Sequence, residues 1–264
     1  MRFFFFNIFY GEGDSGVNKK VVSQVQFLNE HGVEAKLVLI GDSSNLADSP
    51  FIIREDIIKY DTRSIFSRII SSRKIAKVLQ EYIQKLGSSD ILYIRYPLYI
   101  PFCPFNFFKP FRKCKVVFEH NTHIQRQYLL NREYLALFLE FVFGNIVLLQ
   151  ADGGVGMTEE MTDSVRTRIG ERTKPFITIP NGISVGSVRM RTLTVPVPNQ
   201  KITLLCVANF NPWHGIDRLL LGMAGYSGHC SITLHLVGGG SAITDLKELC
   251  TQNNLADRVI FHDF

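Results

Sequence analysis

The chain has 264 residues, of which 46% are hydrophobic and 20% charged, a globular balance that excludes a disordered chain or a collagen-like repeat. Its 29 Lys and Arg against 24 Asp and Glu give a formal net charge of +5. So small an excess suits an anionic ligand or an anionic membrane surface, but it argues against a dedicated nucleic-acid binder.

The first half of the chain alternates strand-like and helical patterns. Val17, Val21, Val25 and Leu28 are spaced by four, four and three residues, which places them on one face of a helix. We predict strands at 3–9, 35–40, 91–95, 116–119, 153–157 and 176–179, and helices at 17–28, 65–86, 128–149 and 158–169. Such alternation predicts an α/β fold with a parallel sheet and crossover helices.

The second half repeats this alternation after a segment rich in Pro, Ser and Thr. We predict a first domain at 1–185, a linker at 186–200 and a second domain at 201–264. The second domain contains predicted strands at 202–207, 232–237 and 259–261, and predicted helices at 216–224 and 242–253. Since α/β domains usually have ~100–150 residues, we expect the second domain to be incomplete or to be completed by another chain.

Cysteines and apolar stretches indicate the compartment. The five cysteines are odd in number and widely spaced, which argues against a disulfide framework or zinc knuckle and favours a reducing cytosol. The apolar run in MRFFFFNIFY lacks a cleavage site and predicts a buried first strand rather than a signal peptide. Residues 134–149 are apolar but shorter than the ~20 residues of a membrane span, and we expect a buried helix there. We therefore predict a cytoplasmic protein, soluble or peripheral at the inner face of a membrane.

Two segments of the first half follow predicted strands and contain polar or glycine residues. Gly11, Gly13 and Gly16 form Gly-x-Gly-x-x-Gly, which suits a phosphate at a helix N-terminus or a tight turn alone. His120 and His123 lie at the carboxyl end of a strand, where ligands of α/β sheets gather. With no third metal ligand nearby, His120 is either a polar group facing the crevice or a histidine that bonds a backbone carbonyl.

Three further segments are strand-to-helix connections when each is taken alone. Ala151–Met161 contains a short glycine-rich strand and a Thr158 helix cap, and Pro180-Asn181-Gly182 forms a sharp turn. Val207–Leu220 includes the sequence PWHGIDRLL, and Gly238–Gly240 opens a helix N-terminus that suits an anion.

Together these segments resemble glycosyltransferase family 4, the retaining sugar-nucleotide-dependent transferases with the GT-B fold. The matching features, in the family's order, are Gly16 with Leu28-x-x-His31-Gly32, Glu119-His120, the Ala151–Met161 segment, Ile179–Ile183, His214–Leu220 and the Leu236–Gly240 loop. The resemblance covers essentially the whole chain and implies two Rossmann-like domains with parallel sheets, the second one incomplete. The first would hold the acceptor and the second the nucleotide sugar.

The resemblance also implies an activity and roles for particular residues. The implied reaction transfers a sugar from a nucleotide-sugar donor to an acceptor hydroxyl with retention, in polysaccharide or glycolipid biosynthesis, without a metal and without nucleic acid. The acceptor would be a glycan or a lipid-linked glycan. His120 would be catalytic and lie beside the reacting sugar. Donor binding would involve Gly16, Asn209, His214, Gly238 and Gly240.

The chain departs from the family pattern in the donor half. Asn209 and His214 stand where the family often has Arg and Lys, and a protonated His214 replaces only part of that charge at neutral pH. The family's paired-glutamate motif would fall beyond residue 264, so we expect weak donor binding. The alternative is a non-catalytic or incomplete subunit that binds acceptor or membrane and needs another chain. A Rossmann-type oxidoreductase is disfavoured, because no acidic ribose-binding residue is evident after the first βαβ unit.

Two basic zones predict contact with anionic lipid, although each also reads as a solvated surface. One spans residues 54–77 and includes Arg68, Arg73, Lys74 and Lys77. In the other, residues 105–115, basic side chains alternate with phenylalanines. They are Lys109, Arg112, Lys113 and Lys115.

Overall fold

The computed structural model describes residues 1–8, 16–40, 50–55, 65–96, 110, 112–130, 132–170, 174–182 and 201–263 of the chain. The chain forms two compact units, which we call unit one, Met1–Ser187, and unit two, Val188–Phe264. Three features of the sequence lie outside the described residues: the turn at Gly11 and Gly13, the segment 97–109, and the predicted linker at 186–200.

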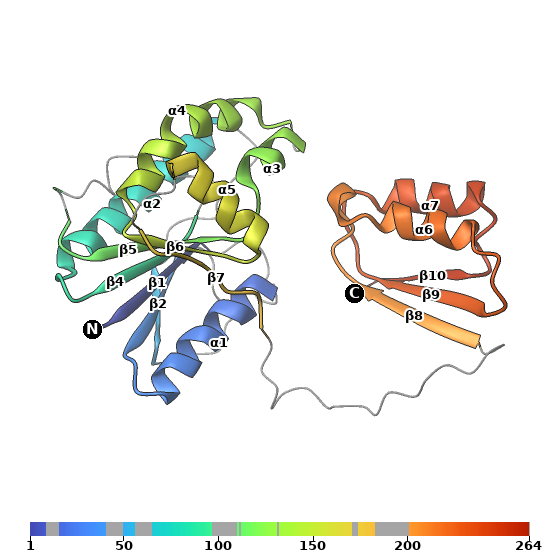
Figure 1. Ribbon diagram of the computed structural model, residues 1–264, viewed down its shortest axis with the longest axis horizontal. Coiled ribbons are helices and arrows are strands. Elements are labelled where there is room, and N and C mark those ends of the chain that lie inside the picture. Colours follow the sequence, from blue (N-terminus) through green and yellow to red (C-terminus); the bar gives the residue numbers. More distant parts are fainter. Residues whose placement is uncertain are drawn as a thin grey trace. The chain divides into compact units, whose positions relative to one another are not determined.

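Unit one contains a seven-stranded parallel sheet in the order β3-β2-β1-β4-β5-β6-β7 (Figure 1). Its strands are β1 (Phe3–Ile8), β2 (Ala35–Ile40), β3 (Ile52–Glu55), β4 (Ile91–Arg95), β5 (Lys115–His120), β6 (Gly153–Gly156) and β7 (Phe176–Thr178). Its helices are α1 (Gly16–Glu30), α2 (Ile65–Lys85), α3 (Ile124–Leu130), α4 (Tyr134–Gln150) and α5 (Glu159–Ile169). The strand order reverses between β1 and β4, and ligands of open α/β sheets gather outside the carboxyl ends of strands at such a point.

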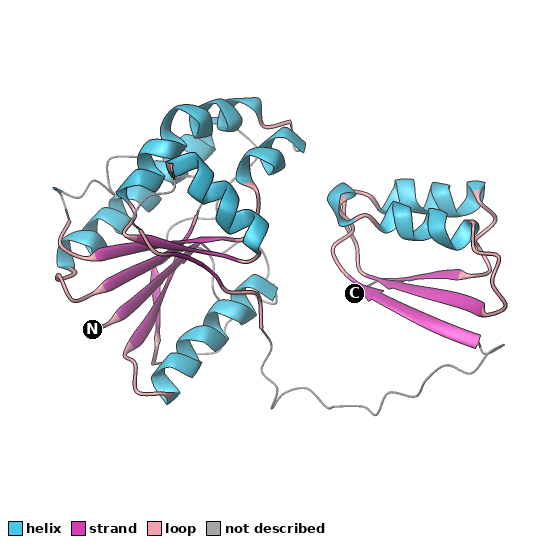
Figure 2. Ribbon diagram, in the orientation of Figure 1, coloured by secondary structure: helices cyan, strands magenta, loops and turns pink. Residues whose placement is uncertain are grey.

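Helices cover both faces of this sheet (Figure 2). On one face Phe5 and Leu37 pack against Val25 of α1. On the other face the sheet packs against α2, α4 and α5, through residues such as Leu79 and Val147. A strand buried on both faces reads as a continuous apolar run rather than an alternating one, which explains the four consecutive phenylalanines of β1.

Unit two contains a three-stranded parallel sheet in the order β10-β9-β8, with two α-helices on one face (Figure 1). Its elements are β8 (Lys201–Val207), the 3₁₀ turn η5 (Pro212–His214), α6 (Ile216–Ala224), β9 (Ser231–Val237), α7 (Ile243–Gln252) and β10 (Val259–His262). Leu234 and Leu236 of β9 pack against Leu220 of α6 and Leu246 of α7. The α/β fold with two parallel sheets that the sequence predicts is therefore confirmed.

The structure differs from the sequence-based prediction in two places within unit one. Strand β3 was not predicted. The helix predicted at 128–149 is divided into α3 and α4 at Arg132, whose left-handed φ of 58° ends α3.

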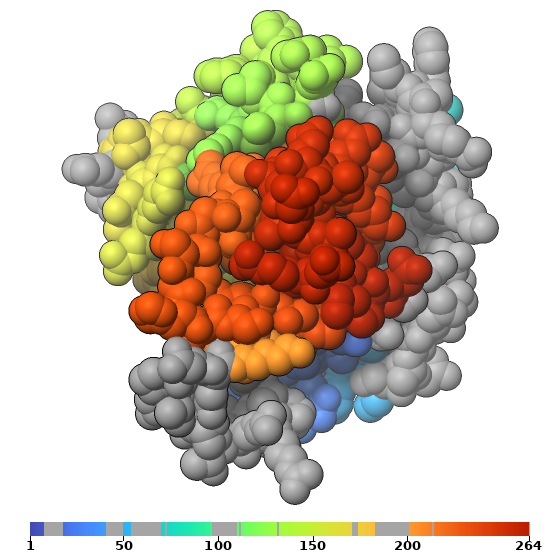
Figure 3. Space-filling model, turned by 90° about the vertical axis from the view of Figure 1, so that its right-hand side faces the viewer, coloured from blue at the N-terminus to red at the C-terminus, as the bar shows by residue number. Residues whose placement is uncertain are grey.

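Helix α4 is not the buried helix that its apolar composition predicts. Glu140, Gly144, Val147 and Leu148 form its buried face, whereas the opposite face is exposed. Side chains of this green region of the chain lie at the molecular surface in Figure 3. A sequence that is apolar on every face of a helix gives no period from which the exposed side can be read. Among the described helices, none combines the length and apolar composition that a membrane span requires.

Candidate functional site

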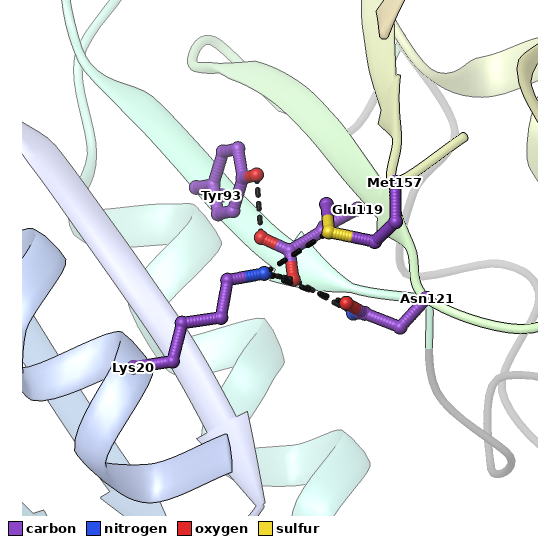
Figure 4. Close-up of polar contacts among 5 residues, drawn as sticks. All are labelled: Lys20, Tyr93, Glu119, Asn121 and Met157. Carbon is purple, nitrogen blue, oxygen red and sulfur yellow. Dashed lines mark hydrogen bonds and ion pairs between the residues drawn. The ribbon is translucent and has the colours of Figure 1, made fainter. Parts of the chain in front are cut away.

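A buried carboxylate at the end of β5 joins α1, β4 and β5 near the strand-order reversal (Figure 4). Glu119 Oε1 accepts hydrogen bonds from Lys20 Nζ at 2.9 Å and from Asn121 Nδ2 at 2.7 Å. Glu119 Oε2 accepts from the Tyr93 hydroxyl at 2.6 Å. Lys20 Nζ also lies 3.4 Å from Asn121 Oδ1 and 3.2 Å from Met157 Sδ.

The hydrogen bonds and charges of this cluster keep Glu119 ionised and hold the Lys20 ammonium group against Glu119, Asn121 and Met157. Burial alone would raise the pKa of Glu119, but the hydrogen bonds from Tyr93, Asn121 and Lys20 hold it below its usual value. Burial and the Glu119 charge together raise the pKa of Tyr93, which stays a protonated donor. Since an ammonium group has three donors and Lys20 has three acceptors, we assign this lysine to the fold rather than to a ligand phosphate.

The next residue, His120, faces the side of the sheet that α4 and α5 cover. Its ring stacks on Tyr96 with centroids 4.8 Å apart and lies 6.5 Å from the Phe176 ring. The residue is only 5% exposed, and its Nε2 has no hydrogen-bond partner among the described residues. Burial, assisted by the positive charge of Arg168, lowers the pKa of His120 to about 3. His120 is therefore neutral at physiological pH and can exchange one hydrogen bond through Nε2.

His120 forms part of the wall of a pocket of about 220 Å³ within unit one. The pocket lies between the start of α3 and the α5 helix. Its described lining residues are His120, Thr122, His123, Ile124, Gln125, Arg126, Glu160, Met161, Ser164, Val165 and Arg168. His123 Nε2 lies 3.5 Å from Glu160 Oε1. Hydroxyl, amide, imidazole and guanidinium groups in one concave site suit a ligand rich in hydroxyl groups.

Behind the pocket, Glu140 of α4 is fully buried and links two of these groups. Its carboxylate accepts a hydrogen bond from the Tyr96 hydroxyl, 3.0 Å from each oxygen, and another from an Arg168 guanidinium nitrogen at 2.8 Å. Gly144 makes room for it, since a Cβ there would lie 2.4 Å from Glu140 Oε1. Burial raises the pKa of Glu140, and the positive charge of Arg168 opposes that rise. The carboxylate thus orients both the ring that stacks on His120 and an arginine of the pocket wall.

The predicted donor-binding residues of unit two lie on two adjacent loops. Phe210 N donates to Gly239 O at 2.7 Å, and Ala242 N donates to Phe210 O at 2.9 Å. Gly240 has φ 147°, and a Cβ on it would lie 2.5 Å from Phe210 O. The loop that carries Asn209 and His214 is therefore packed against the Gly238–Gly240 loop at the carboxyl ends of β8 and β9.

One predicted donor-binding residue, Gly16, belongs to unit one. Gly16 is the first residue of α1, at the carboxyl end of β1. Among the described residues, no group of three or more His, Cys, Asp or Glu could hold a metal ion. No sequence pattern indicates Tyr96 or Glu140, because these residues contact His120 and Arg168 only in the folded chain.

The prediction that Arg112 contacts lipid is wrong. Its side chain is 3% exposed and donates to Asp152 Oδ2 at 2.6 Å and to Gln150 O at 2.5 Å. A guanidinium held by a carboxylate and a carbonyl is part of the fold, and Asp152 also accepts from Val116 N at 2.9 Å.

Comparisons with known proteins show which folds the chain resembles. No family model and no curated protein matches the sequence. Among solved structures, the whole chain is similar to the lipopolysaccharide outer core galactosyltransferase WaaB, with a TM-score of 0.64, 14% identity and 68% of that chain covered. It is also similar over its whole length to the Anabaena protein Alr3699/HepE in complex with UDP, with a TM-score of 0.58, 14% identity and 69% of that chain covered.

A third neighbour bears a different name. The N-terminal domain of Candida albicans trehalose-6-phosphate phosphatase gives a TM-score of 0.68 at 13% identity, over 98% of this chain and 71% of that one. Identities of this size establish the fold and leave membership of glycosyltransferase family 4 a prediction. The protein has an α/β structure of the GT-B type, with a seven-stranded and a three-stranded parallel sheet.

Proposed function

We propose that the protein is a glycosyltransferase that moves a sugar from a nucleotide-sugar donor to an acceptor hydroxyl with retention of configuration. The GT-B fold and its neighbours support this class of reaction. One neighbour is named as a galactosyltransferase, and Alr3699/HepE is described in complexes with UDP and with UDP-glucose. These complexes support a uridine diphosphate sugar as the donor class. The acceptor is a glycan or a lipid-linked glycan.

The observation that carries the proposal is a neutral, unpartnered histidine in the wall of a polar pocket. We assign one sugar hydroxyl to His120 Nε2, which is buried and has no hydrogen-bond partner among the described residues, and the neutral ring adds no charge to the pocket. Thr122, Gln125 and Ser164 add uncharged hydrogen-bonding groups to the same pocket. Its volume of about 220 Å³ is the space of about seven waters, which accommodates a sugar ring.

The proposed chemistry places the developing negative charge on the leaving diphosphate. The bond from the anomeric carbon to the phosphate oxygen breaks, and the acceptor oxygen bonds to that carbon on the same face. The acceptor proton passes to the departing phosphate, and the nucleoside diphosphate leaves. Within unit two, the Gly238–Gly240 loop, Asn209 and His214 supply donors to the diphosphate, so the proposal requires no metal.

The test is an assay of nucleoside diphosphate release from UDP- and GDP-sugars, with and without short glycan acceptors. One UDP-sugar is expected to release UDP, and NMR of the product should show the donor's anomeric configuration. His120→Ala should lower turnover about tenfold or more, the value of one lost hydrogen bond. His31→Ala, a change at an exposed histidine directly after α1, is the matched control.

Three results would contradict the proposal. Unchanged turnover in His120→Ala, together with a lower melting temperature, would make His120 a structural residue. Tight NAD binding with no release from any sugar nucleotide would favour an oxidoreductase. Glycan binding without release would favour the non-catalytic subunit.

A further inference from the structure

Unit one presents a continuous apolar ridge on α3 and α4. The ridge consists of large apolar side chains that are at least 40% exposed: Leu129, Leu130, Tyr134, Leu135, Phe138, Phe141, Val142, Ile146 and Leu149. On α4 they recur at spacings of three and four, so they share one face of a helix that is about 25 Å long. Apolar patches of this extent on a protein surface mark interaction sites.

The exposed face of α4 has no charged side chain. Glu140 is the one acidic or basic residue among residues 134–150, and it points inward to Tyr96 and Arg168. The exposed Asn145 accepts a hydrogen bond from Arg168 Nε at 3.1 Å. The ridge therefore has neither anionic groups nor the mixture of polar groups that would form hydrogen bonds with a protein partner.

Cations outnumber acids at the two ends of the ridge, where the half-buried Glu133 is the one acid among residues 124–150 besides Glu140. Arg126 and Arg132 are exposed at its α3 end, and Lys174 Nζ donates to Leu149 O at its other end. Helix α2 covers the same face of the sheet as α4. Its exposed side chains include one acid, Glu81, and four cations, Arg73, Lys74, Lys77 and Lys85. An apolar strip with basic flanks complements the anionic headgroups and the acyl boundary of a bilayer.

We propose that the α3–α4 ridge is a docking surface for an anionic lipid bilayer. The helix lies along the interface, with Phe138 and Phe141 at the acyl boundary and the flanking Arg and Lys side chains at headgroup phosphates. Helix α5 packs against α4 and carries Glu159, Glu160 and Asp163 in its first half. Because these acids repel anionic headgroups, the proposed orientation turns α5 away from the bilayer and α2 toward it. The apolar part of this surface lies outside both zones where the sequence predicts lipid contact, 54–77 and 105–115, whereas the basic residues of α2 except Lys85 belong to the first of them.

The test is co-sedimentation of the full chain with vesicles. Vesicles of equal parts phosphatidylcholine and phosphatidylglycerol should bind the protein, and phosphatidylcholine alone should not. Binding should weaken as salt rises from ~0.1 M to ~1 M and the screening length falls from ~10 Å to ~3 Å. Phe138→Ser with Phe141→Ser should reduce affinity about tenfold or more. Phe27→Ser is the matched control, because Phe27 is 58% exposed on α1, on the other face of the sheet, against 62% for Phe138 and Phe141.

A second variant keeps the ridge apolar and reports its contact directly. Phe141→Trp on a Trp213→Phe background makes residue 141 the chain's sole tryptophan. Its emission should shift to shorter wavelength with anionic vesicles and stay unchanged with neutral ones.

Three results would overturn the proposal. They are equal binding to both kinds of vesicle, binding to neither, and a dimer in lipid-free solution that Phe138→Ser with Phe141→Ser converts to monomer. The last would make the ridge an interface between copies of the chain.

Discussion

Burial keeps the His120 ring neutral at physiological pH by lowering its pKa to about 3. Its ring stacks on Tyr96, whose hydroxyl is held by Glu140, and Glu140 also holds Arg168 at the pocket wall. Hence three residues from different elements determine how this imidazole can meet a ligand. A neutral Nε2 that no protein group satisfies is suited to discriminate hydroxyl groups, because leaving it unpaired in a filled pocket is unfavourable.

The lowered pKa of His120 gives a pH dependence of stability with a definite sign. Its pKa is about 3 in the folded protein and ordinarily 6.5, so between these values only the unfolded chain binds the proton. This residue therefore lowers the free energy of unfolding as pH falls from 6.5 toward 3, by up to about 1.4 kcal/mol per pH unit. Above pH 6.5 its contribution is constant.

Urea unfolding at a series of pH values measures this effect. The fall in stability below pH 6.5 should be shallower in His120→Asn than in the wild type. His31→Asn, at an exposed histidine, should follow the wild type. Parallel curves for all three proteins would mean that His120 takes up its proton in the folded state.

A double-mutant cycle at Tyr96 and Glu140 tests whether they act as a unit. Tyr96→Phe keeps the ring that stacks on His120 and removes the hydroxyl donor to a charged acceptor, which costs about 1.5–3 kcal/mol. Glu140→Gln should cost a similar amount, and the double variant less than the sum, with a coupling of about 0.5–3 kcal/mol. Tyr134→Phe, an exposed tyrosine of the same helix, should leave the free energy of unfolding unchanged. Strict additivity would contradict the linkage.

For single residues, the sequence indicates candidate positions but not their protonation or their hydrogen-bond partners. The position of His120 at the end of a strand predicts that it belongs to a ligand-binding edge, and in the structure it lines a pocket. Its neutrality depends on Tyr96, Glu140 and Arg168, which lie on other elements and reach it only through packing. For the same reason Arg112 looked like a lipid-binding cation, although Asp152 and Gln150 hold it within the fold.

Among the secondary-structure connections, the two loops of unit two depend on one glycine. Gly240 has a φ in the left-handed region and lies against the Phe210 backbone, so a residue with a Cβ would be strained and would clash there. Gly239 is free of both constraints, since a Cβ there meets nothing within 4 Å and its φ is not in the left-handed region. The two positions make a matched pair for testing the proposed donor site.

Gly240→Ala should displace the loop that carries Asn209 and His214. We expect about tenfold or greater loss of UDP affinity, measured by calorimetry, and a lower melting temperature, since a strained backbone costs about 1–3 kcal/mol. Gly239→Ala should leave both within error of the wild type. Loss of UDP binding in Gly239→Ala, or full retention in Gly240→Ala, would separate this loop from the donor.

Elements with a clear period were predictable, and elements without one were less so. The spacing of Val21 and Val25 gave α1, and Thr158 gave the start of α5, where its Oγ1 accepts a hydrogen bond from Met161 N at 3.2 Å. In α4 the apolar residues surround the helix, and only its packing shows which face is buried. The residue with left-handed backbone between α3 and α4 is Arg132, and arginine is not a residue type from which the end of a helix is predicted.

For the whole molecule, alternation of strands and helices predicted parallel sheets but not their order. Because β1 pairs with β2 on one edge and β4 on the other, the first strand in sequence is in the interior of the sheet. Chain alternation leaves this choice open, since each crossover can step to either side.

The central position of β1 governs what happens while the chain is being made. Its phenylalanines leave the ribosome before the other strands of unit one, yet its second partner, β4, begins only at Ile91. At ~5–20 residues per second, β4 follows β1 by roughly 4–17 s. During that interval an apolar strand with an open edge is available to other nascent chains. Slow translation between codons 40 and 91 would therefore reduce soluble yield without changing one amino acid of the folded protein.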